Sequence, residues 1–176
     1  MPVQDVAIQE REGDLVLGTF GRAAWILDDL RPLREAAAAK GRVLTAYDAP
    51  DAYHWIYAES EGIRFQGHAM FQGENRSGGA RLSYMIQRDT ADKELKKVKW
   101  LRVDVYDPSG ARIRRIETKV PTENGLQRWN WNLRSAGVDR PSMSRSKREN
   151  ANDPGYGPEV KPGRYTLVYT LGPHID

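Results

Sequence analysis

The stretch Asp14-Leu-Val-Leu-Gly-Thr-Phe-Gly-Arg-Ala-Ala-Trp-Ile-Leu-Asp-Asp29 decides the first part of the fold. Its two short apolar runs, 15–19 and 24–27, flank a turn that contains Gly21, which predicts the two strands of a hairpin. A third strand is predicted at 6–8, across a polar turn. Three strands of this size cannot bury both of their faces. We therefore expect this three-stranded meander to belong to a larger sheet structure.

The next segment contains the one convincing helix signal, at 28–42. An aspartate pair at its start can cap a helix, Pro32 suits a first helical turn, and the run 33–40 is rich in alanine. Gly41 suits the position just past the helix end. Because the apolar side chains are mostly alanine, we expect a short linker helix that packs lightly on a sheet.

An aromatic segment follows, in which Tyr53, Trp55 and Tyr57 alternate and can occupy one face of a strand. Alternating aromatic rings can stack on sugars. The simpler interpretation, which we favour, is a strap that packs against the following domain.

From residue 80 the chain alternates apolar and polar residues in short runs separated by turns, which is typical of a β-sandwich. The run 107–110 (Asp-Pro-Ser-Gly) predicts a hairpin turn, and the odd spacing of Ile113 and Ile116 predicts a bulge. The positions predicted to face the core are Leu82, Tyr84, Ile86, Leu101, Val103, Val105, Trp129, Trp131, Leu133, Tyr165, Leu167, Tyr169 and Leu171.

The run Gly18-Thr-Phe-Gly-Arg22, followed by AAWILDDLRPLR, resembles the closing blade of large bacterial β-propellers of the sortilin and sialidase-repeat type. The resemblance covers residues 3–34 and lacks the Ser-x-Asp-x-Gly-x-x-Trp motif of earlier blades, as expected for a segment that follows them. Ala23 stands where a second glycine is usual, which costs little unless its φ is positive. Trp25 is expected to pack inside the blade.

A second resemblance lies in VDVYDPSGARIRRI at 103–116, GLQRWNWNLR at 125–134 and GPEVKPGRYTLVYT at 157–170. These runs are similar to the Ig-like module of flagellar hook-capping proteins and of secreted bacterial propellers. In that family one more strand follows the last of them. The resemblance thus implies a sandwich that lacks its final strand.

Together these observations predict an all-β chain in three parts. Residues 1–30 form a partial propeller blade, a three-stranded meander. Residues 31–79 form the linker helix and aromatic strap, and residues 80–176 form an Ig- or fibronectin-III-like β-sandwich. The resemblance implies an extracellular or periplasmic location and an upstream propeller domain of the same parent chain as partner, although no signal peptide is visible in this sequence.

No catalytic residue set, cofactor site or metal site is recognisable. The chain has no cysteine, and its three histidines lie far apart with no metal-ligand spacing. Glycosidases need two carboxylates that flank the scissile bond. The pair Asp28 and Asp29 is explained by the helix start, and Asp104 and Asp107 belong to a hairpin. We therefore do not expect this chain to be an enzyme by itself.

Three residues are candidates for ligand or interdomain contact: Arg22, Trp55 and Trp100. Arg22 can line a propeller mouth, although a salt bridge with one of the aspartates at 28–29 is the simpler expectation. Trp100 has the opposite parity to Leu101, which places it on the outside of its strand. With Trp55 it can form a carbohydrate-stacking pair or a contact between the blade and the sandwich.

The leading functional hypothesis is a non-catalytic structural or interaction module at the C-terminus of a large secreted propeller protein. The alternatives are the C-terminal portion of a sialidase-like glycoside hydrolase, with catalytic residues upstream, and a carbohydrate-binding module. A protein partner or a carbohydrate fits these hypotheses. A net charge of only +3 argues against nucleic acid, and no apolar run is long enough to span a membrane. The polar stretch 135–157 predicts a solvated loop rather than a polyanion site.

Overall fold

A computed structural model describes residues 2–36, 41–54, 76–88, 93, 97–138 and 156–172. Trp55, Tyr57 and most of the polar stretch 135–157 lie outside these ranges, so the expectations for them stay predictions. The described part is mostly β-structure, arranged in small antiparallel sheets with one short helix, which confirms the all-β prediction.

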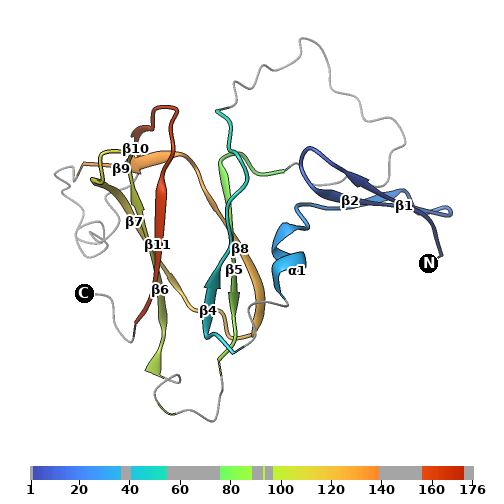
Figure 1. Ribbon diagram of the computed structural model, residues 1–176, viewed down its shortest axis with the longest axis horizontal. Helices are drawn as coiled ribbons and strands as arrows, with labels where there is room; N and C mark the ends of the chain where they lie inside the picture. Colours follow the sequence, from blue (N-terminus) through green and yellow to red (C-terminus); the bar gives the residue numbers. More distant parts are fainter. Residues whose placement is uncertain are drawn as a thin grey trace, which may run out of the picture.

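The first sheet is the predicted meander. It contains the strands β1 (Val3–Gln9), β2 (Asp14–Thr19) and β3 (Ala24–Leu27), each antiparallel to its neighbour in the order β1-β2-β3. We call this sheet the arm, because it extends away from the rest of the molecule at the right of Figure 1. The sequence therefore predicted these three strands correctly, although β1 is longer than the run at 6–8.

The linker helix α1 (Arg31–Glu35) is shorter than the predicted 28–42 and begins after Leu30 without a side-chain cap. Pro32 lies in its first turn, as expected, and is buried. Neither aspartate occupies the N-cap position, which is Leu30. Asp28 pairs with Arg81, whereas the Asp29 carboxylate accepts the backbone N–H of Arg31, the first residue of the helix, at 3.3 Å and also binds the Arg31 guanidinium.

The remaining strands form two three-stranded sheets and a short two-stranded one. One of the two three-stranded sheets has the order β4-β5-β8, with β4 (Leu44–Ala46), β5 (Ala80–Ile86) and β8 (Gly125–Trp131). The second has the order β11-β6-β7, with β6 (Trp100–Tyr106), β7 (Arg112–Lys119) and β11 (Thr166–Gly172). The short sheet pairs β9 (Arg134–Ala136) with β10 (Tyr156–Glu159).

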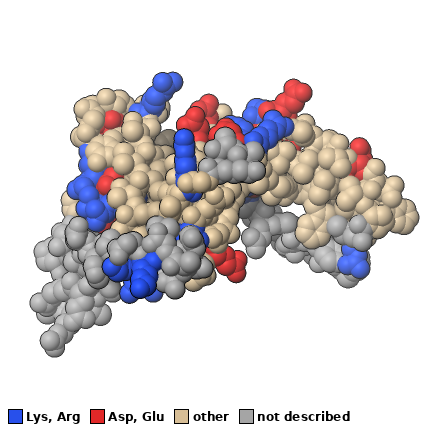
Figure 2. All heavy atoms as spheres, turned by 60° about the horizontal axis from the view of Figure 1, so that its bottom comes forward, with Lys and Arg blue, Asp and Glu red and all other residues tan. Residues whose placement is uncertain are grey.

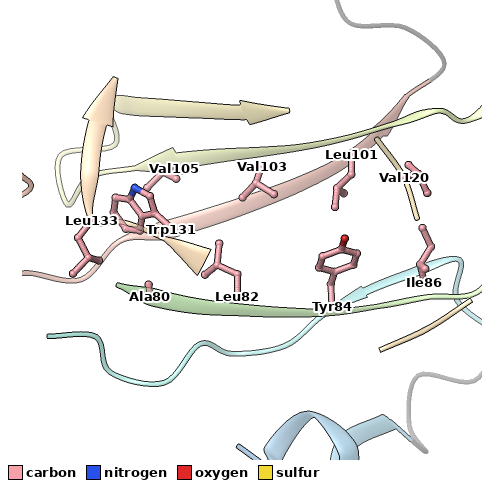
Figure 3. Close-up of a cluster of buried hydrophobic side chains, with 10 residues drawn as sticks. All are labelled: Ala80, Leu82, Tyr84, Ile86, Leu101, Val103, Val105, Val120, Trp131 and Leu133. Atoms are coloured by element: carbon pink, nitrogen blue, oxygen red, sulfur yellow. The ribbon is translucent and has the colours of Figure 1, made fainter. Parts of the chain in front are cut away.

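The two three-stranded sheets pack face to face around the main core, and we call this two-layer body the sandwich (Figure 3). Alternate residues of β5, β6 and β8 point inward, as the strand period of two requires. This confirms the predicted core-facing alternation. The most deeply buried apolar side chains of this core are Leu82, Ile86, Leu101, Val103, Val105 and Trp131. Partly buried side chains pack against them: Trp129, Tyr165, Leu167, Tyr169 and Leu171.

The hairpin between β6 and β7 also has its predicted turn and bulge. The Asp107 carboxylate accepts hydrogen bonds from the backbone N–H groups of Ser109 and Ala111 and from the Ser109 hydroxyl. The Ser109 hydroxyl is the main reason that the pKa of Asp107 is lowered. The register shifts between Val105 and Tyr106, so that Ile113 lies at the bulge.

Candidate interaction surface

The arm has one apolar face, which follows from its register. Residues directly opposite each other in antiparallel strands share a face. Leu17 pairs with Val6 on one side and with Trp25 on the other, and the adjacent row pairs Leu15 with Ile8 and Leu27. We call this the apolar face, and it contains Val3, Val6, Ile8, Leu15, Leu17, Trp25 and Leu27.

The apolar face is open to solvent among the described residues. Val6 is 55% exposed and Trp25 is 56% exposed, and Phe20 at the arm's tip is 75% exposed. In Figure 2 the arm end of the molecule, at the right, is largely uncharged but carries a red and a blue group, whereas more Lys and Arg side chains lie over the sandwich. The prediction that Trp25 packs inside a blade is wrong for this structure, because no second layer of described residues covers its ring.

The turn between β2 and β3 fixes the tip of the arm. The Thr19 hydroxyl donates to the carbonyl oxygen of Ala23 at 2.7 Å, and the Trp25 indole N–H donates to the carbonyl oxygen of Arg22 at 3.1 Å. Gly21 and Ala23 both have positive φ, of 73° and 58°. Ala23 thus holds the left-handed conformation that glycine adopts at lower cost.

Arg22 lies in this turn with its side chain exposed. The expected salt bridge to Asp28 or Asp29 is not formed. Asp28 instead pairs with Arg81 at 2.7 Å, and Asp29 pairs with Arg31 at 2.6 Å. The two aspartates follow β3, whereas Arg22 precedes it. The Arg22 side chain therefore lies at the opposite end of the arm from both carboxylates.

The arm joins the sandwich at a charged corner around residues 28–30, which we call the junction. Arg128, on the outer side of β8, donates to the carbonyl oxygens of both Asp28 and Asp29, the latter at 2.5 Å. The backbone N–H of Asp29 donates to the Asp14 carboxylate at 2.8 Å. Burial, followed by the like charge of Arg81, lowers the pKa of Arg128.

Sequence reasoning missed Arg81 and Arg128. The alternation of the strands could have indicated their position. Each arginine precedes a core-facing residue, Leu82 or Trp129, and therefore points to the outer side of its strand. The two strands are neighbours, so these outward positions form one basic pair on the sheet surface next to the arm. Their acidic partners could not be found from spacing, because Asp28 and Asp29 are remote in the chain.

Of the other two predicted contact residues, only Trp100 lies in the described part of the chain, and it is not at this surface. Trp100 is half-buried on the outer side of β6, between its strand partners Lys119 and Gly172, which confirms its predicted parity. Trp55 lies outside the described residues. The structure therefore does not test whether Trp55 and Trp100 form a carbohydrate-stacking pair.

A shallow hollow opens beside the β6–β7 turn, on the outer side of the sandwich. It is lined by Tyr106, Pro108, Arg164, Thr166 and Val168, together with the backbone of the turn. Among the described residues, none of these side chains is a buried polar group without a hydrogen-bond partner.

Several carboxylates of the described ranges are held by basic or backbone partners. Asp104 is 6% exposed and binds the Arg115 guanidinium at 2.8 Å, a hydrogen bond that raises the pKa of Arg115. Over the same ranges no three His, Asp or Glu side chains gather where they could hold a metal ion. No helix of this part of the chain is long and apolar enough to cross a bilayer.

No protein-family model, curated protein or solved structure matches this chain. The class that the structure itself defines is an all-β protein with a two-layer sandwich and a protruding three-stranded arm.

Proposed function

We propose that this chain is a non-catalytic interaction module of a large secreted β-propeller protein. In this proposal the arm forms part of the last propeller blade, and its apolar face packs against the neighbouring blade. The sandwich is the Ig-like module that follows the propeller. The observation that carries the proposal is the exposed apolar face of the arm, with Leu17 at its centre.

The composition of this face favours a protein partner. Contiguous apolar patches that are exposed on soluble proteins often mark sites of association. Trp25, Val6 and Leu27 present large side chains with no charge among them. Burial of apolar surface contributes about 25 cal/mol per Å², so covering this face favours association.

The size of the face favours a partner within the same chain over a second copy. The face spans about five residue positions along the strands and three strands across, which is about 17 Å by 14 Å, or about 240 Å² in projection. A stable complex between separate proteins buries about 800 Å² on each partner. The apolar face alone is too small for that, whereas a covalently linked neighbour benefits from a high effective concentration. A neighbouring propeller blade meets this requirement.

The test begins with the reading frame that precedes Met1, which we expect to encode blades with the Ser-x-Asp-x-Gly-x-x-Trp motif. That polypeptide, expressed as a separate chain, should bind the present chain only weakly, because the covalent link that raises the effective concentration is then absent, and an NMR titration measures the affinity. Leu17→Ser should weaken the complex at least tenfold, because it places a hydroxyl at the centre of the apolar face. Val168→Ser is the matched control, since Val168 is 43% exposed on the sandwich and lies outside the arm.

Two results would contradict the proposal. One is an upstream sequence without propeller blades. The other is a complex that forms equally well with Leu17→Ser and with the Val168→Ser control, since the contact would then lie elsewhere on the molecule.

A further inference from the structure

The junction holds the corner at Asp28 and Asp29 from two sides. On the arm side, the Asp14 carboxylate accepts the Asp29 N–H, and the carbonyl oxygen of Gly13 accepts the Leu30 N–H at 2.8 Å. On the sandwich side, Arg128 donates to both aspartate carbonyls. The backbone between the two bodies is therefore hydrogen-bonded to each of them.

We infer that the hydrogen bonds from Arg128 to the backbone carbonyls of Asp28 and Asp29, together with the Asp28–Arg81 ion pair, hold the arm and the sandwich as one rigid body, an arrangement that we call the lock. Arg128 is thus a positioning residue that fixes the direction in which the apolar face points. The importance of that direction for a partner rests on the proposed function, whereas the lock itself is a property of this chain alone.

The charges of the junction are balanced, which makes burial of this corner tolerable. The carboxylates of Asp14, Asp28 and Asp29 lie among the guanidinium groups of Arg31, Arg81 and Arg128. Asp29 is fully buried and has a positive φ of 52°, a conformation that aspartate tolerates better than most residues. A buried charge that loses its partner is strongly destabilising, so the buried Asp29 carboxylate depends on its arginine partner Arg31.

A second ion pair and an apolar contact reinforce the lock. Arg76, just before β5, lies 3.3 Å from Glu12 in the β1–β2 turn. Behind the junction, Ala36 at the end of α1 packs against the buried pair Tyr47 and Met85 on the outer side of the sandwich. The arm is therefore held at its base by three sets of contacts: the junction, the Arg76 pair and the helix packing (Figure 1).

The lock can be measured as a distance distribution between two spin labels. The chain has no cysteine, so Gln4→Cys at the far end of the arm and Lys161→Cys on the sandwich give a single labelled pair. Both positions are exposed. We expect a narrow, single-peaked distance distribution in the otherwise unchanged chain. In Arg128→Gln the distribution should be at least twofold broader, because glutamine is uncharged and has only one of the two NH₂ groups with which Arg128 binds the carbonyls.

Arg102→Gln is the matched control, because Arg102 is also a partly buried arginine held by a hydrogen bond, in its case to the Glu117 carboxylate at 2.9 Å, but on the sheet remote from the arm. It should leave the width unchanged. Arg128→Lys, which keeps the charge, should broaden the distribution less than Arg128→Gln. If Arg128→Gln does not fold, as judged by circular dichroism, Arg81→Gln and Asp28→Asn report on the same lock.

A broad distribution in the chain with an intact junction overturns the inference, as does an unchanged width in folded variants that lack Arg128 or the Asp28–Arg81 pair. These results require no partner. They therefore leave the test of the proposed function, which uses Leu17→Ser, independent of the test of the lock.

Discussion

The rings of Trp131 and Tyr165 meet edge to face, with their centroids 5.5 Å apart and their planes at 71°. This contact joins the end of β8 to the segment that leads into β11, and therefore connects the two sheets of the sandwich. The Trp131 indole N–H also donates to the carbonyl oxygen of Arg134 at 2.9 Å. The ring thus contributes both apolar burial and a satisfied polar group.

Trp131→Ala should lower the free energy of unfolding by about 3–5 kcal/mol, because it leaves a cavity between the sheets. Trp131 is only 3% exposed. Lys161→Ala, an exposed position on the same body, should change this free energy by less than about 0.5 kcal/mol. Urea denaturation followed by circular dichroism measures both. Equal effects of the two substitutions would contradict the placement of Trp131 in the core.

Gly79→Ala should be nearly as damaging as the loss of Trp131, for a different reason. Gly79 has a φ of 101°, and a Cβ built on it would lie 2.2 Å from the carbonyl oxygen of Trp131. Backbone would have to move, at the point where β5 begins beside the end of β8. We expect a loss of at least about 2 kcal/mol of stability in the same denaturation experiment. A substitution that leaves stability unchanged would mean that the two backbones do not approach so closely.

Ala23→Gly should stabilise the arm, contrary to the usual effect of glycine in a β-hairpin. The left-handed conformation costs an L-residue about 1–2 kcal/mol, which glycine does not incur. The greater freedom of glycine in the unfolded chain offsets about 0.5–1 kcal/mol of this gain in stability. The matched control is Ala24→Gly, in the first position of β3, which should reduce stability. Hydrogen exchange of the β2 amides reports on both variants. Faster exchange in Ala23→Gly would contradict the positive φ.

The stability of the sandwich should fall at alkaline pH because of Tyr169. Burial, followed by the proximity of Tyr84, raises the pKa of Tyr169 from 10.0 to about 12. A raised pKa means that the folded state favours the neutral phenol, so this contribution is fully present below pH 10 and is lost as the pH rises towards 12. A shift of this size corresponds to roughly 2–3 kcal/mol.

Tyr169→Phe removes this ionisation and should move the alkaline unfolding midpoint to higher pH. At pH 7 we expect little loss of stability, because the Tyr169 hydroxyl has no hydrogen-bond partner among the described residues. Unfolding monitored by circular dichroism between pH 7 and pH 12 distinguishes the variants. An unchanged alkaline midpoint would show that Tyr169 does not control this transition.

Local sequence pattern determined the strands of this protein. The alternation of Leu101, Val103 and Val105 predicted both the strand and its inward face, because neighbouring side chains of a pleated strand point to opposite sides. The same rule placed Trp100 on the outside and Trp131 in the core, and the odd spacing around Ile113 predicted the bulge. Each of these predictions depends only on residues a few positions apart.

The tertiary structure alone decided how the arm is attached and what remains uncovered. The sequence predicted the arm's strands, yet it placed Trp25 inside a blade and assigned Asp28 and Asp29 to a helix cap. In the structure Trp25 is exposed, and both aspartate carbonyls bind Arg128, about 100 residues along the chain. A strand period states which side a residue points to, but not what lies on that side. Only the packing of α1 and β8 against the base of the arm determines that the aspartates meet arginines and the apolar face meets solvent.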